Sequence, residues 1–168
     1  MLERERLYMQ ESMDAAIINA YQAAGADISI TGTISEVSYI AEEADTNLKI
    51  GDEIVRVNDV EIHSLDDLRA IIEELDEDEQ VQLDVIRDDE ELECYAYTYN
   101  TDDGMKIGVS LLTTYEYTTN PEVSITSKAS EAGSSGGLMM SLTIYNKLVE
   151  EDITGGKKVV GTGTIDID

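Results

Sequence analysis

The segment of residues 48–75 changes its hydrophobic period within a few residues, and this change constrains the fold more than any other feature. In LKIGDEIVRVNDVEI the apolar residues flank an Asn58-Asp59 pair, which predicts two short strands joined by a turn. The apolar residues that follow are spaced three or four apart and predict the buried stripe of a helix: Leu65, Leu68, Ile71, Ile72 and Leu75. The segment therefore predicts an α+β arrangement.

A serine marks the start of this helix. The hydroxyl of Ser64 can accept a hydrogen bond from a free backbone N–H of the first turn, and Asp67, three residues later, can reach back in a capping box. Two alternating runs follow, at residues 80–86 and 91–99, and predict a hairpin that turns at RDDEE.

The ends of the chain carry further elements. Apolar residues at helical spacing over residues 5–24, followed by Gly25, predict an amphipathic helix that a glycine ends. A second helix is expected to run to about Val149. Strands are expected at residues 27–31, 33–40, 106–112, 122–129 and 156–168, and the polar residues 100–104 are expected to form a boundary.

The charge of the chain argues against some classes of partner and ligand. Eleven Lys and Arg stand against thirty-seven Asp and Glu, a formal net charge of -26 that repels nucleic acid and anionic lipid. The acidic residues 76–79 and the NTDDG segment at 100–104 lack the spacing of a calcium loop. We expect no metal and no cofactor, and we interpret the acidic runs as solvated loops.

Cys94 and His63 are the single cysteine and the single histidine. Cys94 excludes an internal disulfide and lies in an alternating strand, where it is expected to pack as a small hydrophobe. His63 immediately precedes the helix cap, so a Cys-His or Ser-His pairing remains conceivable but disfavoured. No apolar run approaches the roughly 20 residues that span a bilayer, and MLERER does not resemble a signal peptide, so we expect a soluble chain.

The central segment resembles a PDZ domain of the bacterial protease-associated kind, over roughly residues 26–99. The residues that match the family pattern in order are Leu48, Gly51, Asp52, Ile54, Val57, Asn58, Ser64 and Leu68. The resemblance implies a groove between the strand at 33–40 and the helix at 65–75, where an extended peptide adds to the strand. It places Gly32, Thr33 and Ile34 in the carboxylate-binding loop and Leu68 and Ile72 in the pocket; the alternative is that Leu68 and Ile72 only fill the core.

The stretch EAGSSGGLMMSLTIYNKLV reads by composition as a linker, but the apolar run after it continues at helical spacing. A serine at such a junction faces the free N–H groups of a first helical turn, which can bind an oxyanion. The stretch resembles the proteolytic domain of Lon-type serine proteases, with matches at Gly133, Ser135, Gly137, Leu138 and Met139. Ser134 stands where the family has proline and Gly136 where it has alanine, and both changes loosen the loop.

This second resemblance implies that Ser135 is the nucleophile, that Gly133, Ser134 and Gly136 form its loop, and that a buried lysine is the base. The lysine is expected several tens of residues after the serine, whereas the sequence given runs only thirty-three residues past Ser135 (168 - 135). Lys147 lies twelve positions along the helix, about 18 Å away at about 1.5 Å per residue, and Lys157 and Lys158 match positions outside the dyad.

The order of the blocks resembles the membrane-anchored PDZ and Lon-domain proteases of Gram-positive bacteria. We expect an N-terminal helix at 1–25, a PDZ-like domain at 26–100, and the first half of a Lon-type α/β domain at 105–168. The leading hypothesis is an inactive fragment of a serine endopeptidase, whose parent is anchored by an N-terminal transmembrane helix, faces the extracellular side and takes peptide or protein substrates. The alternatives are a peptide-binding module with a structural Lon-like half, and an acidic scaffold without a ligand.

Overall fold

The computed structural model describes residues 2–126 and 134–167, and the chain divides into two compact units. The central unit is Thr33–Thr113, and the terminal unit combines Met1–Gly32 with Thr114–Asp168. The two longest strands, β1 (Asp27–Ile40) and β8 (Val109–Asn120), contribute residues to both units.

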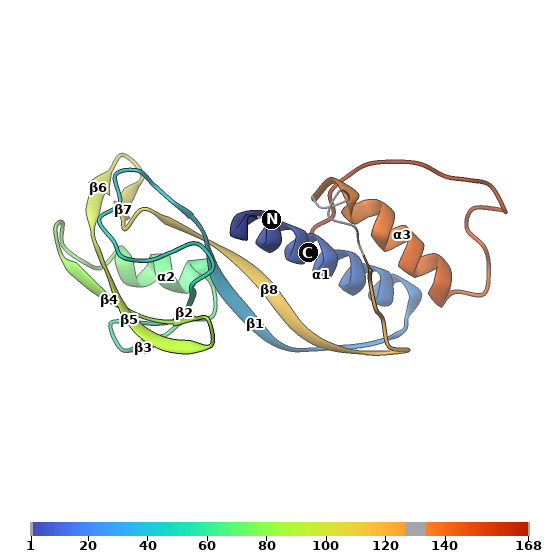
Figure 1. Cartoon of the computed structure of the whole chain (residues 1–168), viewed down its shortest axis with the longest axis horizontal. Helices are drawn as coiled ribbons and strands as arrows, with labels where there is room; N and C mark the ends of the chain where they lie inside the picture. Colours follow the sequence, from blue (N-terminus) through green and yellow to red (C-terminus); the bar gives the residue numbers. More distant parts are fainter. Residues whose placement is uncertain (1, 127–133, 168) are drawn as a thin grey trace. The chain divides into compact units, whose positions relative to one another are not determined.

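One sheet holds most of the strands, in the order β5-β4-β2-β1-β8, with β3 paired to β2 (Figure 1). Its remaining strands are β2 (Glu53–Val57), β3 (Val60–Glu61), β4 (Gln80–Arg87) and β5 (Glu90–Tyr97). A separate two-stranded sheet pairs β6 (Tyr99–Thr101) with β7 (Gly104–Lys106). In this order β1 has a neighbour on each side, whereas β8 lies at an edge of the sheet.

Two tight turns set the register of the antiparallel pairs. Asn58 and Asp59 have φ values of 47° and 65° between β2 and β3, and Asp88 and Asp89 have 52° and 64° between β4 and β5. Positive φ at both central residues is the backbone of the tightest hairpin turn, and Asn and Asp tolerate it best after glycine. The β4–β5 ladder then pairs without a break from Arg87↔Glu90 to Gln80↔Tyr97.

Helix α2 (Leu65–Ile72) begins at the serine that the sequence indicates. The Ser64 hydroxyl accepts a hydrogen bond from the Asp67 N–H at 3.2 Å, and the Asp67 carboxylate accepts one from the His63 N–H at 2.9 Å. The pKa of Asp67 is lowered, and the hydrogen bond from the His63 N–H is the largest cause. The predicted cap is therefore confirmed, although the aspartate reaches one residue further back than in a capping box.

The apolar face of α2 packs on the inner face of the sheet. The buried residues of this core are Val37, Leu48, Ile54, Val57, Ile62, Leu68, Ile72, Val81, Leu83, Val85, Cys94, Ala96 and Ile107. Three members of the predicted stripe, Leu65, Ile71 and Leu75, pack against it while partly exposed. Cys94 is a small hydrophobe in this core, as predicted.

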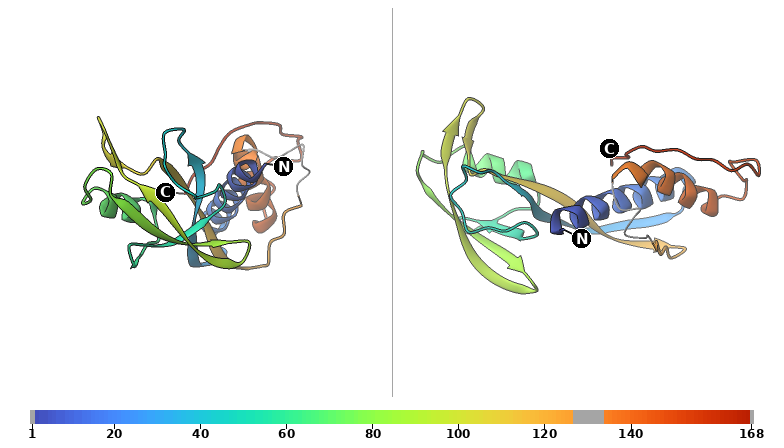
Figure 2. Two further views of the ribbon diagram at one scale, coloured as in Figure 1. Left: turned by 60° about the vertical axis from the view of Figure 1, so that its left-hand side comes forward. Right: turned by 45° about the horizontal axis from the view of Figure 1, so that its top comes forward.

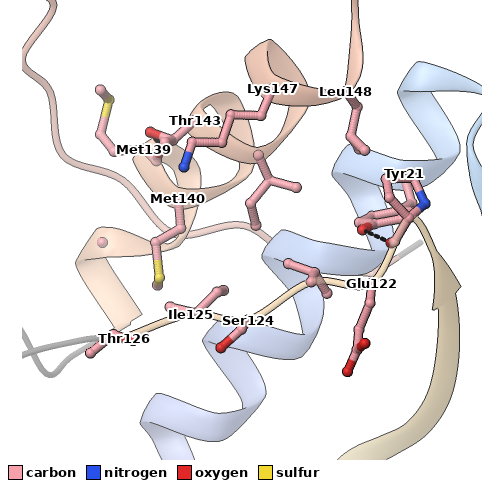
Figure 3. A pocket seen from close by; sticks show the side chains of 14 residues that line it. Tyr21, Glu122, Ser124, Ile125, Thr126, Met139, Met140, Thr143, Lys147 and Leu148 are labelled. Carbon is pink, nitrogen blue, oxygen red and sulfur yellow. Dashed lines mark hydrogen bonds between the residues drawn. The ribbon is translucent and has the colours of Figure 1, made fainter.

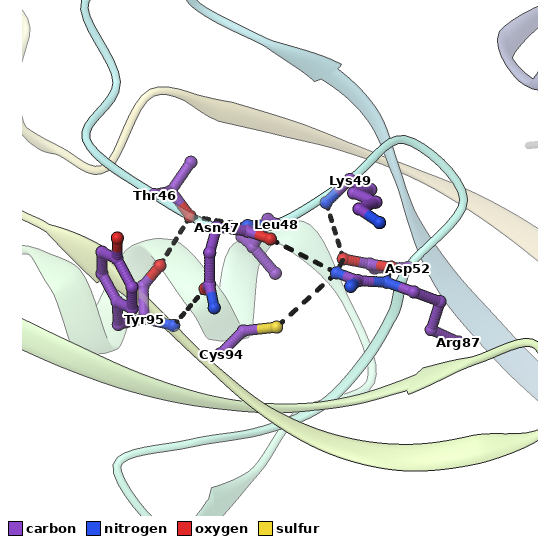
Figure 4. A network of polar contacts seen from close by, with 8 residues as sticks. All are labelled: Thr46, Asn47, Leu48, Lys49, Asp52, Arg87, Cys94 and Tyr95. Atoms are coloured by element: carbon purple, nitrogen blue, oxygen red, sulfur yellow. Dashed lines mark hydrogen bonds and ion pairs between the residues drawn. The ribbon is translucent and has the colours of Figure 1, made fainter.

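A network of polar contacts around Asp52 and Arg87 lies near the end of β4 (Figure 4). The guanidinium of Arg87 donates to both carboxylate oxygens of Asp52, with Nε–Oδ1 at 2.6 Å and Nη2–Oδ2 at 2.7 Å, while the backbone N–H of Lys49 also donates to Asp52. The hydrogen bonds to Asp52 raise the pKa of Arg87 above its ordinary value. The same Nη2 lies 3.7 Å from Sγ of Cys94, whose thiol pKa is raised chiefly by burial.

The terminal unit is built on two helices that lie side by side, α1 (Glu3–Ala24) and α3 (Gly137–Leu148) (Figures 1 and 2). Helix α1 ends as predicted at Gly25, whose φ of 65° is a left-handed conformation that a glycine adopts without strain. The buried residues between the helices and the strands below them are Ala16, Ile17, Ala20, Tyr21 and Ile144.

Asp14 of α1 is buried in this unit among neutral donors. Its carboxylate accepts hydrogen bonds from Nε2 of Gln10 at 2.8 Å, from the backbone N–H of Tyr115 at 3.0 Å and from Oη of Tyr117 at 3.3 Å. Burial raises the pKa of Asp14, and the three hydrogen bonds offset part of that increase.

The α+β class, the N-terminal helix, the capped helix and the β4–β5 hairpin are confirmed, but several strands differ from expectation. The expected strands at 27–31 and 33–40 form one strand, β1, and β8 extends eight residues beyond the expected end at Leu112. Residues 122–126 and 157–167 form no strand, although Gly163 exchanges backbone hydrogen bonds with Ser135 and Leu138. Residues 127–129 lie outside the described residues.

The compact units also divide the chain at different residues from the expected domains. Residues 100–104, expected as a boundary, are part of the β6–β7 hairpin inside the central unit. The boundaries between the units fall instead within β1, after Gly32, and within β8, after Thr113. None of the helices in the described part of the chain is long and apolar enough to span a bilayer.

Candidate peptide-binding groove

A cavity of about 210 Å³ lies between α2 and the segment that leads from β7 into β8. One wall consists of α2 residues on a single helical face, Leu65, Leu68, Arg69, Ile72 and Glu73, and the opposite wall of residues at 103 and 105–110. Leu68 and Ile72 are 2% and 3% exposed, so their side chains serve both the core and the floor of the cavity. The two alternatives for these residues are therefore compatible.

Gly108 shapes the second wall. Its φ of 75° is left-handed, and a Cβ on this residue would lie 2.6 Å from Cβ of Ala44 and 2.9 Å from Oη of Tyr99. Its carbonyl accepts a hydrogen bond from the Ala41 N–H at 2.7 Å, which ties the segment to the end of β1. Glycine is required here by both conformation and space.

The start of β8 presents a free strand edge beside the cavity. The carbonyls of Gly108 and Ser110 face β1, where they accept from Ala41 N–H and from Oγ of Ser38 at 3.2 Å. Because backbone groups alternate in direction along a strand, those of Val109 face away from β1. No other strand of the sheet, as far as the chain is described, pairs with that edge of β8.

The residues that line this cavity differ in part from those that the sequence predicts for a groove. Gly32, Thr33 and Ile34 do not line the cavity, and in the strand order β1 lies between β2 and β8 and not at an edge of the sheet. Gly32 instead faces Glu116, since a Cβ on it would lie 2.6 Å from Oε2 of that residue. Leu68 and Ile72 are the predicted groove residues that line the cavity.

The second wall, Lys106 to Ser110, was not predicted. A signal was present in the sequence, because a glycine directly before an alternating run, as in KIGVSLL, is typical of a special turn that enters a strand. The strand order could not be predicted from these local signals. The strand order determines which strand has a free edge.

The rim of the groove carries charges of both signs. Arg69 donates to Asp66 at 3.3 Å, and Lys106 donates to Asp103 at 3.3 Å. The side chain of Arg69 is 63% exposed and that of Lys106 is 44% exposed. Glu73 forms no ion pair within the described residues. The pairs are exposed, so a ligand can compete for either cation at little cost.

Ser135 belongs to the terminal unit, in a 3₁₀ turn (η2, Ser134–Gly136) that leads into α3. The residue is exposed, and its carbonyl accepts from the Gly163 N–H at 2.8 Å and from Oγ1 of Thr162 at 3.1 Å. Ser134 and Gly136 share the turn, whereas Gly133 lies outside the described residues.

Gly136, next to Ser135, borders a second cavity of about 540 Å³ (Figure 3). Its walls are the extended residues 121–126 and the face of α3 with Met139, Met140, Thr143 and Lys147. Oη of Tyr21 closes one end through a hydrogen bond of 2.5 Å to the Pro121 carbonyl.

The candidate bases are separate from the serine. Lys147 lines the second cavity, Lys157 and Lys158 are exposed, and none of the three hydrogen-bonds Ser135. His63 is exposed and lies 3.8 Å from Glu61, and Cys94 contacts Arg87, so neither forms the conceivable Cys-His or Ser-His pair. No group of three or more potential metal ligands is present in the described part of the chain.

Comparison with known proteins identifies the central part of the chain. Residues 29–96 match the PDZ domain family, so the chain contains a PDZ domain. Among solved structures, the PDZ domain of the SdrC-like protein from Listeria monocytogenes is similar, with 17% sequence identity and a TM-score of 0.42 over 51% of this chain and 92% of that one. A search of curated proteins found no match.

Proposed function

We propose that the chain binds the C-terminal end of an extended peptide in the groove between α2 and the start of β8. The observation that carries the proposal is the free edge of β8 beside a cavity with an apolar floor. An extended peptide gains main-chain hydrogen bonds from a strand edge, and its side chains gain specificity from an adjacent pocket. The match to the PDZ family supports this function independently.

Backbone groups and side chains of the groove have different roles in this proposal. The backbone of Val109 offers hydrogen bonds to the peptide backbone, and Leu68 and Ile72 offer apolar surface to its terminal side chain. The turn at Ile107 and Gly108, next to Lys106, is the candidate site for the terminal carboxylate, because consecutive backbone N–H groups in such a turn attract an anion.

Titration of the full chain with matched peptides tests this proposal. We expect a free-acid peptide with an apolar last residue to bind, and its amidated form to bind at least about tenfold more weakly, since a charge-assisted hydrogen bond is lost. Gly108→Ala should abolish binding because the new Cβ meets Ala44 and Tyr99. Gly104→Ala is the matched control: it has the same sign of φ, and nothing lies within 4 Å of its Cβ.

Each variant is checked by circular dichroism, so that loss of the fold is not mistaken for loss of the site. Equal binding of amidated and free-acid peptides, or full binding by a folded Gly108→Ala variant, would contradict the proposal.

We further propose, as a second function, that Ser135 is the nucleophile of a serine endopeptidase for which the PDZ domain recruits substrate. Its exposed position in the turn before α3 and the resemblance of GSSGGLMM to the Lon-type motif support this role. Because no described lysine reaches Ser135, residues 1–168 alone are expected to be inactive.

The expected outcome concerns a longer protein that supplies a lysine base. There Ser135→Ala should abolish peptide cleavage, while Ser134→Ala should retain much of it. Cleavage by residues 1–168 that is lost on Ser135→Ala would show instead that a base is already present.

A further inference from the structure

We infer that the groove selects peptides whose apolar C-terminal residue is preceded by basic side chains. The inference rests on the proposed peptide binding and adds the chemical class of the ligand. It follows from the arrangement of four charged side chains on the rim: Arg69, Glu73, Asp103 and Lys106.

Each wall of the groove contributes one cation and one anion. Arg69 and Glu73 come from α2, and Asp103 and Lys106 come from the segment opposite. A ligand that satisfies both signs must itself carry both, and a peptide C-terminus with a basic residue before it does so. Its carboxylate competes for the cations, and its basic side chain meets the anions.

Glu73 is the anion best placed to select a basic side chain. It forms no ion pair within the described residues, whereas Asp103 already faces Lys106 at 3.3 Å. Glu73 also follows the last residue of α2, where the partial negative charge of the helix end adds to its own. The next residues continue the negative charge, since residue 74 and residues 76–79 are all acidic.

The charge of the whole chain acts in the same direction. A net charge of -26 repels acidic peptides and attracts basic ones at long range, with an effect that falls off over about 8 Å at physiological salt. The two cations on the rim are local exceptions in this field. They allow a terminal carboxylate to approach a protein that otherwise repels it.

The test uses the full chain and three labelled peptides with the same apolar, free-acid last residue. The peptides carry Lys, Gln or Glu at the two preceding positions, and binding is measured by fluorescence anisotropy. We expect affinity to fall in the order Lys, Gln, Glu, by about threefold or more at each step, because the pairs involved are partly exposed. The preference should shrink when salt is raised from 50 to 500 mM.

Paired variants separate local contacts from the overall charge. Glu73→Gln with Asp103→Asn should bring the Lys and Glu peptides close to equal affinity. The control, Asp89→Asn with Glu91→Gln, removes the same charge from the β4–β5 hairpin and should leave most of the preference intact, because neither residue lines the groove.

The outcomes distinguish the inference from the function on which it rests. Binding of all three peptides with equal affinity, tighter binding of the Glu peptide, or equal effects of the two double variants would overturn the inference and leave peptide binding in place. Failure of all three peptides to bind would overturn the proposed peptide binding itself.

Discussion

Among the described residues each unit buries one carboxylate, and the two carboxylates have different partners. In the central unit Asp52, which is 1% exposed, meets the guanidinium of Arg87 in a two-bonded pair. In the terminal unit Asp14, also 1% exposed, accepts hydrogen bonds from neutral donors of Gln10, Tyr115 and Tyr117 within the described part of the chain. A counter-charge compensates the desolvation of a buried carboxylate more fully than neutral donors do.

The difference predicts two kinds of response to perturbation. The central unit depends on a pair of charges, so the removal of one partner leaves the other buried without compensation. In the terminal unit burial raises the pKa of Asp14, so the stability of this unit is expected to respond to pH.

Removal of Asp52 is expected to have the largest effect. Asp52→Ala leaves the Arg87 guanidinium, which is 20% exposed, without its partner and frees the turn held at Lys49. Breaking a buried pair in this way costs about 3–5 kcal/mol of unfolding free energy. Urea denaturation followed by circular dichroism measures it.

Asp84→Ala provides the control, because Asp84 pairs with the exposed Arg56 at 3.5 Å and should cost less than about 1 kcal/mol. Equal losses for the two variants would mean that the network in Figure 4 has no special role.

The pH dependence of Asp14 is the second test. Its folded-state pKa is raised above the ordinary value of 3.8, so the folded state binds the proton more tightly than the unfolded state does. The stability that this group contributes is present below the unfolded pKa and is lost as the pH rises through the folded pKa. The pKa of Glu11 is also raised, by burial and by repulsion from Asp166 and Asp14, and this adds an effect of the same sign on stability.

We therefore expect the unfolding free energy of the wild type, minus that of Asp14→Asn, to decrease as the pH rises from below 3.8 toward neutrality. A difference for Asp14→Asn that is flat or increases over this range would show that burial does not dominate at this carboxylate.

The smallest effect is expected at the helix cap. Ser64→Ala removes the acceptor for the Asp67 N–H at the start of α2 and should reduce the unfolding free energy by about 1 kcal/mol. Ser64→Asp retains an acceptor and should restore most of this loss. An alanine variant as stable as the wild type would mean that packing of Leu68 and Ile72 alone holds the helix in place.

Local signals in the sequence predicted the local structure. Ser64 before the apolar stripe, the Asn58-Asp59 and Asp88-Asp89 turns, and Gly25 after α1 each act over a few residues, and each is where the sequence indicates. These features depend on backbone conformation and short-range hydrogen bonds, which the identity of the residue itself determines.

The full lining of the cavity beside α2 could not be predicted in the same way. The residues of α2 that line it were predicted, because a helix face follows from spacing. The opposite wall depends on β8 lying at the edge of the sheet and β1 in its interior, which is decided by contacts between residues far apart in the sequence. The strand character of TTYEYTT, rich in Thr and Tyr, was a missed local signal for the length of β8.

The most direct test of the account maps a bound peptide onto the backbone by nuclear magnetic resonance. The ¹⁵N-labelled chain is titrated with a free-acid peptide that ends in an apolar residue, and amide shifts are followed residue by residue. We predict the largest changes at residues 106–111 and along α2 near Leu68 and Ile72, with Gly32, Thr33 and Ile34 little affected. The largest changes at Gly32, Thr33 and Ile34, with residues 106–111 unaffected, would contradict the account.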